Sequence, residues 1–354
     1  MLKKILIIDL GSVWGGQEIY SYNLMSSYKD KKYYIISISS QMKFKDIADE
    51  FYNISNHYFN FLNLKKLIEK LSQNVDIVHF NGNRALYLSL ICKKTKPYIG
   101  TKHLPYFVGT EKNIKNIISQ FLGKYLLKNI DSLICVAQAT YNDLPIAIQK
   151  NAVVVYNGVD IGLNKYIHRI SGNLKICYVA RLTEHKGIVS VLNIIKQLFE
   201  KDNLIIELSI AGTGELQEYV EDFIKTNKHL SINYLGFLDS PRDIYAKSHL
   251  GILLSTYEGM PLNILEAFSA GLPFIAYDIP GVNEVIHNNY NGYLVEADNE
   301  KVVKEYIKKL AFNKEFVLEM SKNANYDYNN MYSLNIMVDN TLKVYKNKIN
   351  ENFN

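Results

Sequence analysis

The chain has 354 residues, of which 48% are hydrophobic and 21% are charged, and its formal net charge is +5. This composition excludes an intrinsically disordered chain, and the length suffices for two domains of ordinary size. No apolar run approaches the roughly 20 residues that a membrane-spanning helix needs. Three widely spaced cysteines, Cys92, Cys135 and Cys177, predict neither a disulfide framework nor a metal cluster and favour a reducing cytoplasm.

Short apolar runs alternate with helical patterns through the first 160 residues. This alternation predicts an α/β domain with a doubly wound parallel sheet, whose functional loops follow the carboxyl ends of the strands. The expected strands are 5–9, 34–38, 77–80, 97–101, 132–136 and 153–156. The expected helices lie near 17–28, 61–72, 84–94, 112–128 and 138–144.

The positive charge is concentrated in this first half. Residues 1–160 contain 20 Lys and Arg against 12 Asp and Glu, which is +8, and the rest of the chain sums to −3. The excess favours an anionic partner such as a bilayer face or a diphosphate-linked acceptor, although solubility alone explains it as well. The expected helix 112–128 is apolar with lysines at its edges, so it would either lie on an anionic membrane or pack on its own sheet. No nucleic-acid-binding motif is present, and we expect no nucleic-acid partner.

Two kinds of loop residue in this half are candidates for ligand binding. Gly15 and Gly16 follow the first expected strand, where they would let the backbone approach a ligand at the start of a helix. Two adjacent glycines are weak evidence by themselves, and a flexible turn is the alternative. His79 and His103 end two further strands, and each is interpreted either as a buried structural histidine or as a group that binds a ligand near neutral pH.

A change of pattern near residue 160 predicts the domain boundary. Asn157-Gly158-Val159-Asp160 is a turn signal, and residues 161–173 show little periodicity. We therefore predict a first domain at 1–160, a linker at 161–173 and a second domain at 174–330.

The second domain begins with an expected strand at 174–179, which is followed by Arg181 and Lys186. Cations at the carboxyl edge of a sheet stabilise the negative charge that develops on a departing diphosphate. Arg grips phosphate oxygens in pairs, and Lys acts as a point charge. A solvated basic loop is the alternative. Gly212, in a Gly-x-Gly after the next expected strand, is a weak signal that would also suit a dinucleotide enzyme.

Residues 250–271 are the most informative part of the sequence. The apolar run 250–254 predicts a buried strand, and Pro261 suits the first position of a helix that ends near Gly271. The turn between them would leave free N–H groups and the positive end of a helix dipole at the sheet edge. Together these features predict a binding site for an anion such as a diphosphate.

Two carboxylates flank this predicted anion-binding site. Glu258 lies in the turn and Glu266 lies eight positions on, within the helix. A carboxylate repels a phosphate because both are negatively charged, but it accepts hydrogen bonds from sugar hydroxyls. The pattern therefore indicates a nucleotide-sugar, with a helix that carries ordinary surface glutamates as the alternative.

Residues 257–267, Tyr-Glu-Gly-Met-Pro-Leu-Asn-Ile-Leu-Glu-Ala, resemble the signature of retaining GT-B glycosyltransferases of family 4. The resemblance is strong from about residue 150 to 295 and thinner before that. It implies a GT-B fold, in which two Rossmann-like doubly wound domains face a cleft. It also implies that the N-terminal domain binds the acceptor, that the C-terminal domain binds the nucleotide-sugar, and that a final helix at 331–354 packs back on the N-terminal domain.

The resemblance further implies roles for individual residues. Arg181 and Lys186 would hold the diphosphate, Glu258 the donor sugar and Glu266 the ribose, while His103 would lie near the reacting sugar. Arg181, Lys186, Glu258 and His103 are accordingly expected to be catalytic. The other expected donor-binding residues are Gly15, Gly16, Gly212, Phe237, Gly259, Met260, Pro261, Leu262 and Asn263.

These expectations describe a retaining glycosyltransferase that moves a sugar from a UDP- or GDP-linked donor to an acceptor hydroxyl. The acceptor is expected to be lipid-linked or a saccharide, in the synthesis of bacterial surface polysaccharide such as O-antigen, capsule or lipopolysaccharide. No Asp-x-Asp pair occurs in the sequence, so we expect neither a metal nor another cofactor. The expected location is the cytoplasm, with peripheral contact to the cytoplasmic face of the inner membrane.

Three alternatives remain open at this point. A nucleotide-sugar epimerase of the same architecture would use the donor without an acceptor. A nicotinamide-dependent oxidoreductase would need the full Gly-x-Gly-x-x-Gly that the first loop lacks. A non-catalytic sugar-binding subunit would not require both cations and both carboxylates.

One departure from the family pattern is Ala180, where a glycine is usual, and we expect its methyl group to be tolerated.

Overall fold

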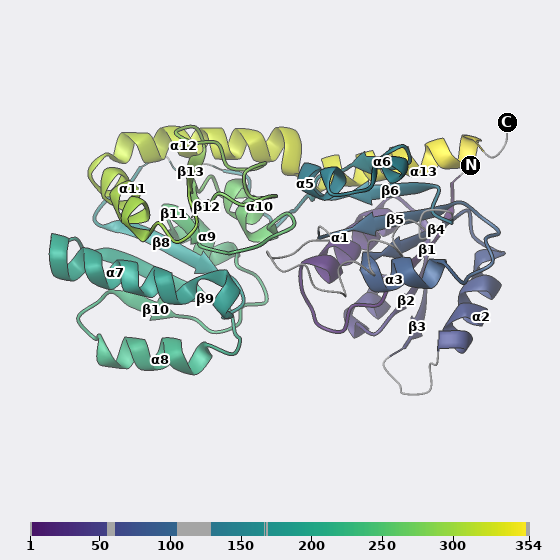
Figure 1. The fold of residues 1–354 in the computed structure, drawn as a ribbon, viewed down its shortest axis with the longest axis horizontal. Coiled ribbons are helices and arrows are strands. Elements are labelled where there is room, and N and C mark those ends of the chain that lie inside the picture. The colour runs from purple at the N-terminus through teal and green to yellow at the C-terminus, as the bar shows by residue number, and fades with distance from the viewer. Residues whose placement is uncertain (1, 55–60, 105–128, 166, 168, 352–354) are drawn as a thin grey trace. The chain divides into compact units, whose positions relative to one another are not determined.

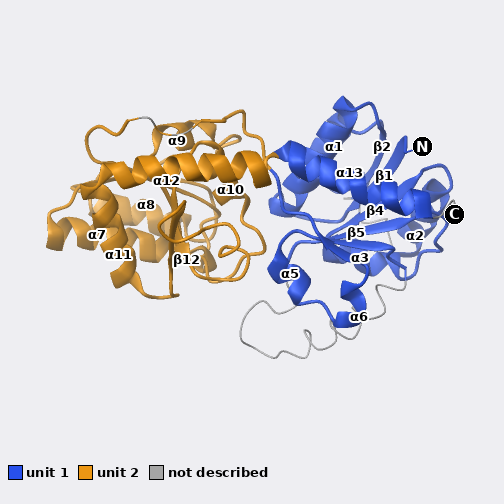
Figure 2. Cartoon of the chain, turned by 90° about the horizontal axis from the view of Figure 1, so that it is seen from above, with its two compact units in different colours: residues 1–158, 334–354 blue, residues 159–333 orange. Residues whose placement is uncertain are grey.

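The structure is a computed structural model that describes residues 2–54, 61–104, 129–165, 167 and 169–351. The chain forms two compact units (Figures 1 and 2). Unit 1 comprises residues 1–158 and 334–354, and unit 2 comprises residues 159–333. The expected helix 112–128 lies outside the described residues.

Unit 1 is built on a seven-stranded sheet in the order β3-β2-β1-β4-β5-β6-β7, in which all neighbouring strands are parallel. The strands are β1 (Lys4–Asp9), β2 (Tyr34–Ser39), β3 (Glu50–Asn53), β4 (Ile77–Asn81), β5 (Tyr98–Lys102), β6 (Ser132–Cys135) and β7 (Ala152–Val154). The chain runs outward from β1 to β3 and then returns to place β4 on the other side of β1. The sheet therefore has a topological switch point between β1 and β4. The edge strand β3 was not among the expected strands, because it is half-buried and has no apolar run.

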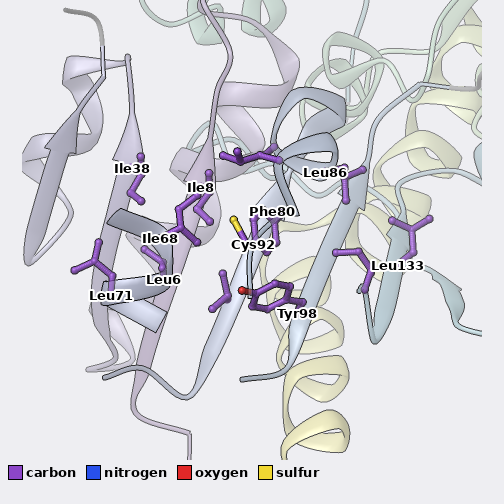
Figure 3. Packing of buried hydrophobic residues seen from close by; sticks show 14 of the residues in the cluster. Leu6, Ile8, Ile38, Ile68, Leu71, Phe80, Leu86, Cys92, Tyr98 and Leu133 are labelled. Carbon is purple, nitrogen blue, oxygen red and sulfur yellow. The ribbon is translucent and has the colours of Figure 1, made fainter. Parts of the chain in front are cut away.

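Helices cover both faces of this sheet (Figure 1). They are α1 (Gly16–Asp30), α2 (Phe61–Ser72), α3 (Gly82–Ser89), α5 (Gln138–Asn142), α6 (Ile146–Gln149) and α13 (Leu334–Glu351), with a 3-10 turn, η1, at Met42–Asp46. Figure 3 shows one face, where Leu6 and Ile8 of β1 and Phe80 of β4 pack with Ile68 and Leu71 of α2. This apolar cluster holds α2 and α3 on the sheet.

The opposite face of the sheet is tied to α13 by a buried polar contact. His79 lies on β4 between two residues of the apolar cluster, so its side chain points to the other face. Its Nδ1 is hydrogen-bonded to the Tyr345 hydroxyl of α13, and its Nε2 lies 2.7 Å from the Thr101 hydroxyl. The last helix of the chain is thereby part of unit 1.

Unit 2 contains a six-stranded sheet in the order β10-β9-β8-β11-β12-β13, again with all neighbours parallel. The strands are β8 (Leu174–Val179), β9 (Ile206–Ala211), β10 (Ile232–Tyr234), β11 (Leu250–Leu253), β12 (Phe274–Tyr277) and β13 (Gly292–Val295). The helical elements are η2 (Glu184–Lys186), α7 (Ile188–Asp202), α8 (Gln217–Thr226), α9 (Arg242–Lys247), α10 (Leu262–Ser269), α11 (Glu300–Phe312), α12 (Lys314–Asp327) and η3 (Tyr328–Tyr332). The switch point lies between β8 and β11. The predicted doubly wound parallel sheet is confirmed in both halves of the chain.

The residues expected to form a linker, 161–173, belong to unit 2. The Lys165 N–H donates to the Ser269 carbonyl at 3.1 Å, and the Ile167 N–H donates to Ser321 Oγ at 2.6 Å. These bonds attach the segment to α10 and α12. The sequence of the segment has no periodicity, so it does not predict this packing. The chain passes between the units at Gly158–Val159 and again at Ser333–Leu334.

We expect Tyr345→Phe to destabilise unit 1 by about 1–3 kcal/mol, because it leaves the Nδ1 of fully buried His79 without its partner. Trp14 is the single tryptophan of the chain and lies in unit 1, so its fluorescence during urea unfolding reports on this unit. Tyr326→Phe, at a side chain that is 63% exposed, is the matched control and should leave the midpoint unchanged. Equal midpoints for Tyr345→Phe and the unchanged chain would contradict the prediction.

Candidate active site

The carboxyl edge of the unit 2 sheet collects the loops that carry most of the predicted site. β8 and β11 are neighbours at the switch point, and they are followed by loops 180–187 and 254–261. A parallel sheet places the carboxyl ends of adjacent strands at one edge, so loops far apart in the sequence meet there. The Thr256 N–H donates to the His185 carbonyl at 2.9 Å and joins the two loops directly.

An ion pair between Lys186 and Glu258 also joins these loops. The two side chains are mostly buried, with 15% and 11% of their surfaces exposed. Partial burial strengthens the attraction between the charges but also costs desolvation. Each charge is therefore held in the site by the other. Beside the pair, the rings of His185 and Tyr257 stack with their centroids 4.6 Å apart.

Arg181 adds a second cation to this cluster, and its side chain is exposed. Burial lowers the pKa of His185, and the charges of Lys186 and Arg181 lower it further. The carboxylates of Glu258 and Glu215 act on the same ring in the opposite direction. All four charges thus lie within electrostatic range of one imidazole. An exposed guanidinium beside a mostly buried ammonium is suited to an anion with several oxygens.

Glu266 lies on α10, where its carboxylate accepts a hydrogen bond from the Tyr245 hydroxyl at 3.2 Å. The same hydroxyl lies 3.1 Å from the Asn263 carbonyl. The Asn263 side chain donates to the Val179 carbonyl at 2.7 Å and so ties the start of α10 to the end of β8. Burial raises the pKa of Glu266 to about 7, and the hydrogen bond from Tyr245 partly offsets this rise. The carboxyl group therefore titrates near neutral pH.

The start of α10 presents backbone donors. Pro261 is its N-cap in an extended conformation, and neither a capping side chain nor an acidic residue occupies its first turn. Gly259, Met260 and Pro261 are buried beside it, and Leu262 is half-buried. A helix N-terminus of this kind favours negative charge. The helix begins one residue later than predicted, because Pro261 serves as the cap and not as the first helical residue.

The loops after β9 and β10 extend this edge. Gly212 follows β9 with a φ of +136°, and a Cβ at this position would collide with the Ala180 carbonyl. Gly212 thus allows the loops after β8 and β9 to touch at Ala180. Phe237 follows β10, and 61% of its side chain is exposed. A large exposed ring at this edge offers a flat surface on which a base can stack.

A separate cavity of about 300 Å³ lies at the carboxyl edge of unit 1, at the switch point between β1 and β4. It is lined by the loop after β1, the start of α1, the start of α3 and His103. The Gly15 N–H donates to the Glu18 carboxylate at 3.0 Å, and α1 begins at Gly16. The two predicted glycines therefore form the start of the helix beside the cavity.

The two histidines of this edge have different environments. Burial lowers the pKa of His79 to about 3, and both of its ring nitrogens are hydrogen-bonded within the core, which supports the structural interpretation. His103 Nε2 lies 2.7 Å from Asn81 Oδ1, and the ring packs edge-on against Tyr20. Burial also lowers the pKa of His103 to about 3. Because His103 lines the cavity, it is the histidine positioned to meet a ligand.

The structure brings the predicted residues of unit 2 to one sheet edge, and it places Gly15, Gly16 and His103 at the corresponding edge of unit 1. Sequence reasoning missed the residues that support them, among them Tyr245, the His185–Tyr257 stack, Asp9 and Asn81. Only the position of Asp9 and Asn81 at the ends of strands could have drawn attention to them. Among the described residues, no cluster of His, Cys, Asp and Glu has the arrangement of a metal site.

Two family models match consecutive parts of the chain. Residues 14–163 match the model described as Glycosyltransferase Family 4, and residues 164–327 match the model described as Glycosyl transferases group 1. The division between the two matches falls close to the boundary between the two units. None of the described helices is both long and apolar enough to cross a bilayer.

One relative and a solved structure resemble nearly the whole chain, and a second relative resembles two thirds of it. The N,N'-diacetylbacillosaminyl-diphospho-undecaprenol alpha-1,3-N-acetylgalactosaminyltransferase of Campylobacter jejuni is 23% identical over 93% of this chain and 96% of its own length. The UDP-Gal:alpha-D-GlcNAc-diphosphoundecaprenol alpha-1,3-galactosyltransferase of Escherichia coli is 29% identical over 67% of this chain and 66% of its own length. The crystal structure of Anabaena HepE in complex with UDP-glucose superimposes with a TM-score of 0.79 and 18% identity, covering 97% of this chain and 99% of that one. This last likeness concerns the fold.

We expect Glu266→Gln to stabilise the chain more at about pH 8 than at about pH 5. The pKa of Glu266 is about 7 in the folded chain, above its ordinary value of 4.5, so the folded chain binds this proton more tightly than the unfolded chain. Its contribution to stability is complete below a pH of about 4.5 and is lost as the pH rises through about 7. The glutamine variant does not titrate and avoids this loss, which is at most about 3 kcal/mol.

Scanning calorimetry at both pH values measures this difference. Glu218→Gln, at an exposed position of α8, is the control and should shift the melting temperature equally at both. A Glu266→Gln effect that does not depend on pH would show that the carboxyl group does not titrate in this range.

Proposed function

The chain belongs to the family 4 glycosyltransferases of the GT-B fold, and we propose that it transfers a sugar from a UDP- or GDP-linked donor to an acceptor hydroxyl with retention of the anomeric configuration. The observation that carries this proposal is the cluster of Arg181, Lys186 and Glu258 at the switch point of unit 2. The cluster joins two cations, a carboxylate and the N-terminus of α10 at one sheet edge.

Arg181 and Lys186 stabilise the leaving group in this proposal. When the bond between sugar and phosphate breaks, negative charge builds up on the diphosphate, and cations that are already in place favour that charge. The backbone of Gly259, Met260 and Pro261 leads into the uncapped helix, whose dipole acts in the same direction. We propose that these groups make a divalent ion unnecessary, so that a chelator leaves activity unchanged.

Glu258 and Glu266 bind the transferred sugar and the ribose of the donor. When the donor binds, its diphosphate replaces Glu258 as the partner of Lys186. Glu258 is then free to accept hydrogen bonds from hydroxyls of the transferred sugar. The backbone amides of Leu262 and Asn263 donate to the same sugar. Glu266, held by Tyr245, accepts from the ribose. Gly212 and Phe237 flank the nucleoside at the neighbouring loops. Within unit 1, Gly15, Gly16 and His103 bind a substrate group at the edge of that unit's own sheet.

The acceptor is a lipid-linked or free saccharide in the assembly of a surface polysaccharide. The names of the Campylobacter and Escherichia relatives describe transferases that act on sugars linked to undecaprenol by a diphosphate, which supports this class of acceptor. The charge of +8 in residues 1–160 is consistent with such an anionic substrate.

We further propose that unit 1 contacts the anionic cytoplasmic face of a membrane. Val13 and Met42 are exposed apolar side chains, and Lys43 lies 4.7 Å from the centre of the Trp14 ring. Lys45 is exposed on the same 3-10 turn. Apolar and basic side chains on adjacent loops suit an interface between lipid and water.

Arg181→Ala and Lys186→Ala are each expected to lower turnover by on the order of 10²-fold or more, because each removes a charge that stabilises the departing diphosphate. The donor is first found by testing which nucleotide-sugar raises the melting temperature. Transfer is then followed by release of the nucleoside diphosphate with and without a chelator, and the anomeric form of the product is read by NMR.

The matched control for these two variants is Lys175→Ala, which removes a lysine of unit 2 that pairs with Glu207 at the surface. It should leave turnover unchanged. If Arg181→Ala and Lys186→Ala both fold and keep near-normal rates, the leaving-group site is assigned to the wrong residues. Donor conversion without any acceptor would instead indicate an epimerase.

Replacing both Lys43 and Lys45 by Glu is expected to weaken binding to vesicles that contain anionic phospholipid by on the order of 10-fold or more. Sedimentation with vesicles measures this, and neutral vesicles should bind weakly in every case. Replacement of Lys225 and Lys228 of unit 2 by Glu changes the net charge equally and is the control. If both double variants lose binding to the same extent, the attraction is to net charge and not to this surface.

A further inference from the structure

The carboxylate of Asp9, at the end of β1, organises a buried polar network in unit 1. Asp9 is fully buried. Its Oδ1 accepts hydrogen bonds from the Gly11 N–H at 3.0 Å and from Gln17 Nε2 at 2.9 Å. Its Oδ2 accepts from Ser21 Oγ at 2.6 Å and from Asn81 Nδ2 at 2.9 Å. A buried carboxylate surrounded by donors determines where every proton around it lies, because it can only accept.

This network determines the orientation of the Asn81 amide. Asn81 Nδ2 faces Asp9 Oδ2 and, at 3.2 Å, the Gln17 carbonyl, and both of these oxygens only accept. Ser21 gives its hydroxyl proton to Asp9, so the third contact, at 2.7 Å, is a hydrogen bond from Asn81 to Ser21 Oγ. A reversed amide would place its oxygen against a carboxylate and a carbonyl. The Asn81 oxygen therefore points away from Asp9, toward His103.

The Asn81 oxygen in turn determines the tautomer of His103. Its Oδ1 lies 2.7 Å from His103 Nε2 and can only accept, so Nε2 carries a proton. Burial, together with the charges of the neighbouring His79 and Lys102, lowers the pKa of His103 to about 3, so the ring is neutral. A neutral ring with Nε2 protonated has an unprotonated Nδ1. That nitrogen accepts hydrogen bonds and cannot donate them.

We infer that Asn81, oriented by Asp9, is a positioning residue that sets His103 to accept a hydrogen bond through Nδ1, and that the ligand group it takes is a sugar hydroxyl. A phosphate oxygen of a nucleotide-sugar only accepts, so it would face the lone pair of Nδ1 without a proton between them. A hydroxyl donates and fits. His103 lines the cavity of about 300 Å³ at this edge, which has room for such a group. This inference rests on the proposed function for the identity of the ligand, but the tautomer does not depend on it.

The tautomer is tested directly in the unmodified chain by NMR. Nitrogen shifts of the histidine rings are recorded on protein labelled with ¹⁵N-histidine, and His103→Gln identifies the signals of His103. We expect one protonated nitrogen, Nε2, and one unprotonated nitrogen, Nδ1, without change between about pH 6 and 8. A protonated Nδ1, or a ring that carries both protons in this range, overturns the inference. This measurement needs no substrate.

Asn81→Asp tests the positioning role. A carboxylate at position 81 would face Asp9 and favour a second proton on His103, so that Nδ1 becomes a donor. We expect kcat/KM to fall by about 10-fold at low pH, the effect of one lost hydrogen bond, and to recover as the pH rises and His103 loses that proton. Among the described residues, the titratable groups near His103 are His79 on β4, Lys102 on β5 and Tyr20 on α1, together with Glu18 and Arg84 in the lining of the same cavity, and none of them is changed.

Asn291→Asp is the matched control. Asn291 is also fully buried, its side chain also donates to a carboxylate, that of Asp327, at 2.8 Å, and its oxygen accepts from the His287 N–H at 2.7 Å. Its replacement should cost similar thermal stability and leave the pH profile unchanged. If folded Asn81→Asp has the same pH profile as the unmodified chain, Asn81 has no positioning role. If the NMR result is as expected but no sugar transfer is found with any donor, the network stands and the proposed function fails.

Discussion

The geometry of parallel sheets is the constraint on which both candidate sites depend. In each unit the chain leaves one central strand, builds outward on one side and then returns to the other side, so two neighbouring strands release their loops at the same edge. The loops after β8 and β11 meet in unit 2, and those after β1 and β4 meet in unit 1. Residues that are separated by more than 70 positions become neighbours in this way: Lys186 contacts Glu258, and Asp9 contacts Asn81.

The two edges differ in how their charged and polar groups are used. Unit 2 places cations and a helix N-terminus beside carboxylates, an arrangement that provides both for an anion and for hydroxyl groups. The pairing of Lys186 with Glu258 keeps each charge satisfied while the site is free of ligand, and a diphosphate can replace the carboxylate as the partner of the lysine. Charges that are already oriented need little reorganisation when the donor arrives, and this is the condition under which they favour a charged transition state.

Unit 1 relies on a network of buried polar groups beside a cavity that Glu18 and Arg84 also line. Asp9 is the only charged member of its network, and its charge is used to orient neighbours and not to meet a ligand. The Asp9 carboxylate fixes the orientation of the Asn81 amide, and the amide oxygen fixes which nitrogen of the His103 ring carries the proton. A ring that stays neutral across the physiological range is suited to recognising hydroxyl groups, whose own protonation does not change there.

The sequence by itself determined the doubly wound sheets, the strand-to-helix turn at 250–271 and the cluster of Arg181, Lys186 and Glu258, because these follow from local patterns and from the rule that loops gather at one sheet edge. Tertiary structure alone decided the rest. β3 forms at a sheet edge without an apolar run, the segment 161–173 packs within unit 2, and Glu266 owes its raised pKa to burial beside Tyr245. The path from Asp9 to His103 spans four segments of the chain, and hydrogen-bond directions across such distances are set by packing, which no local pattern encodes.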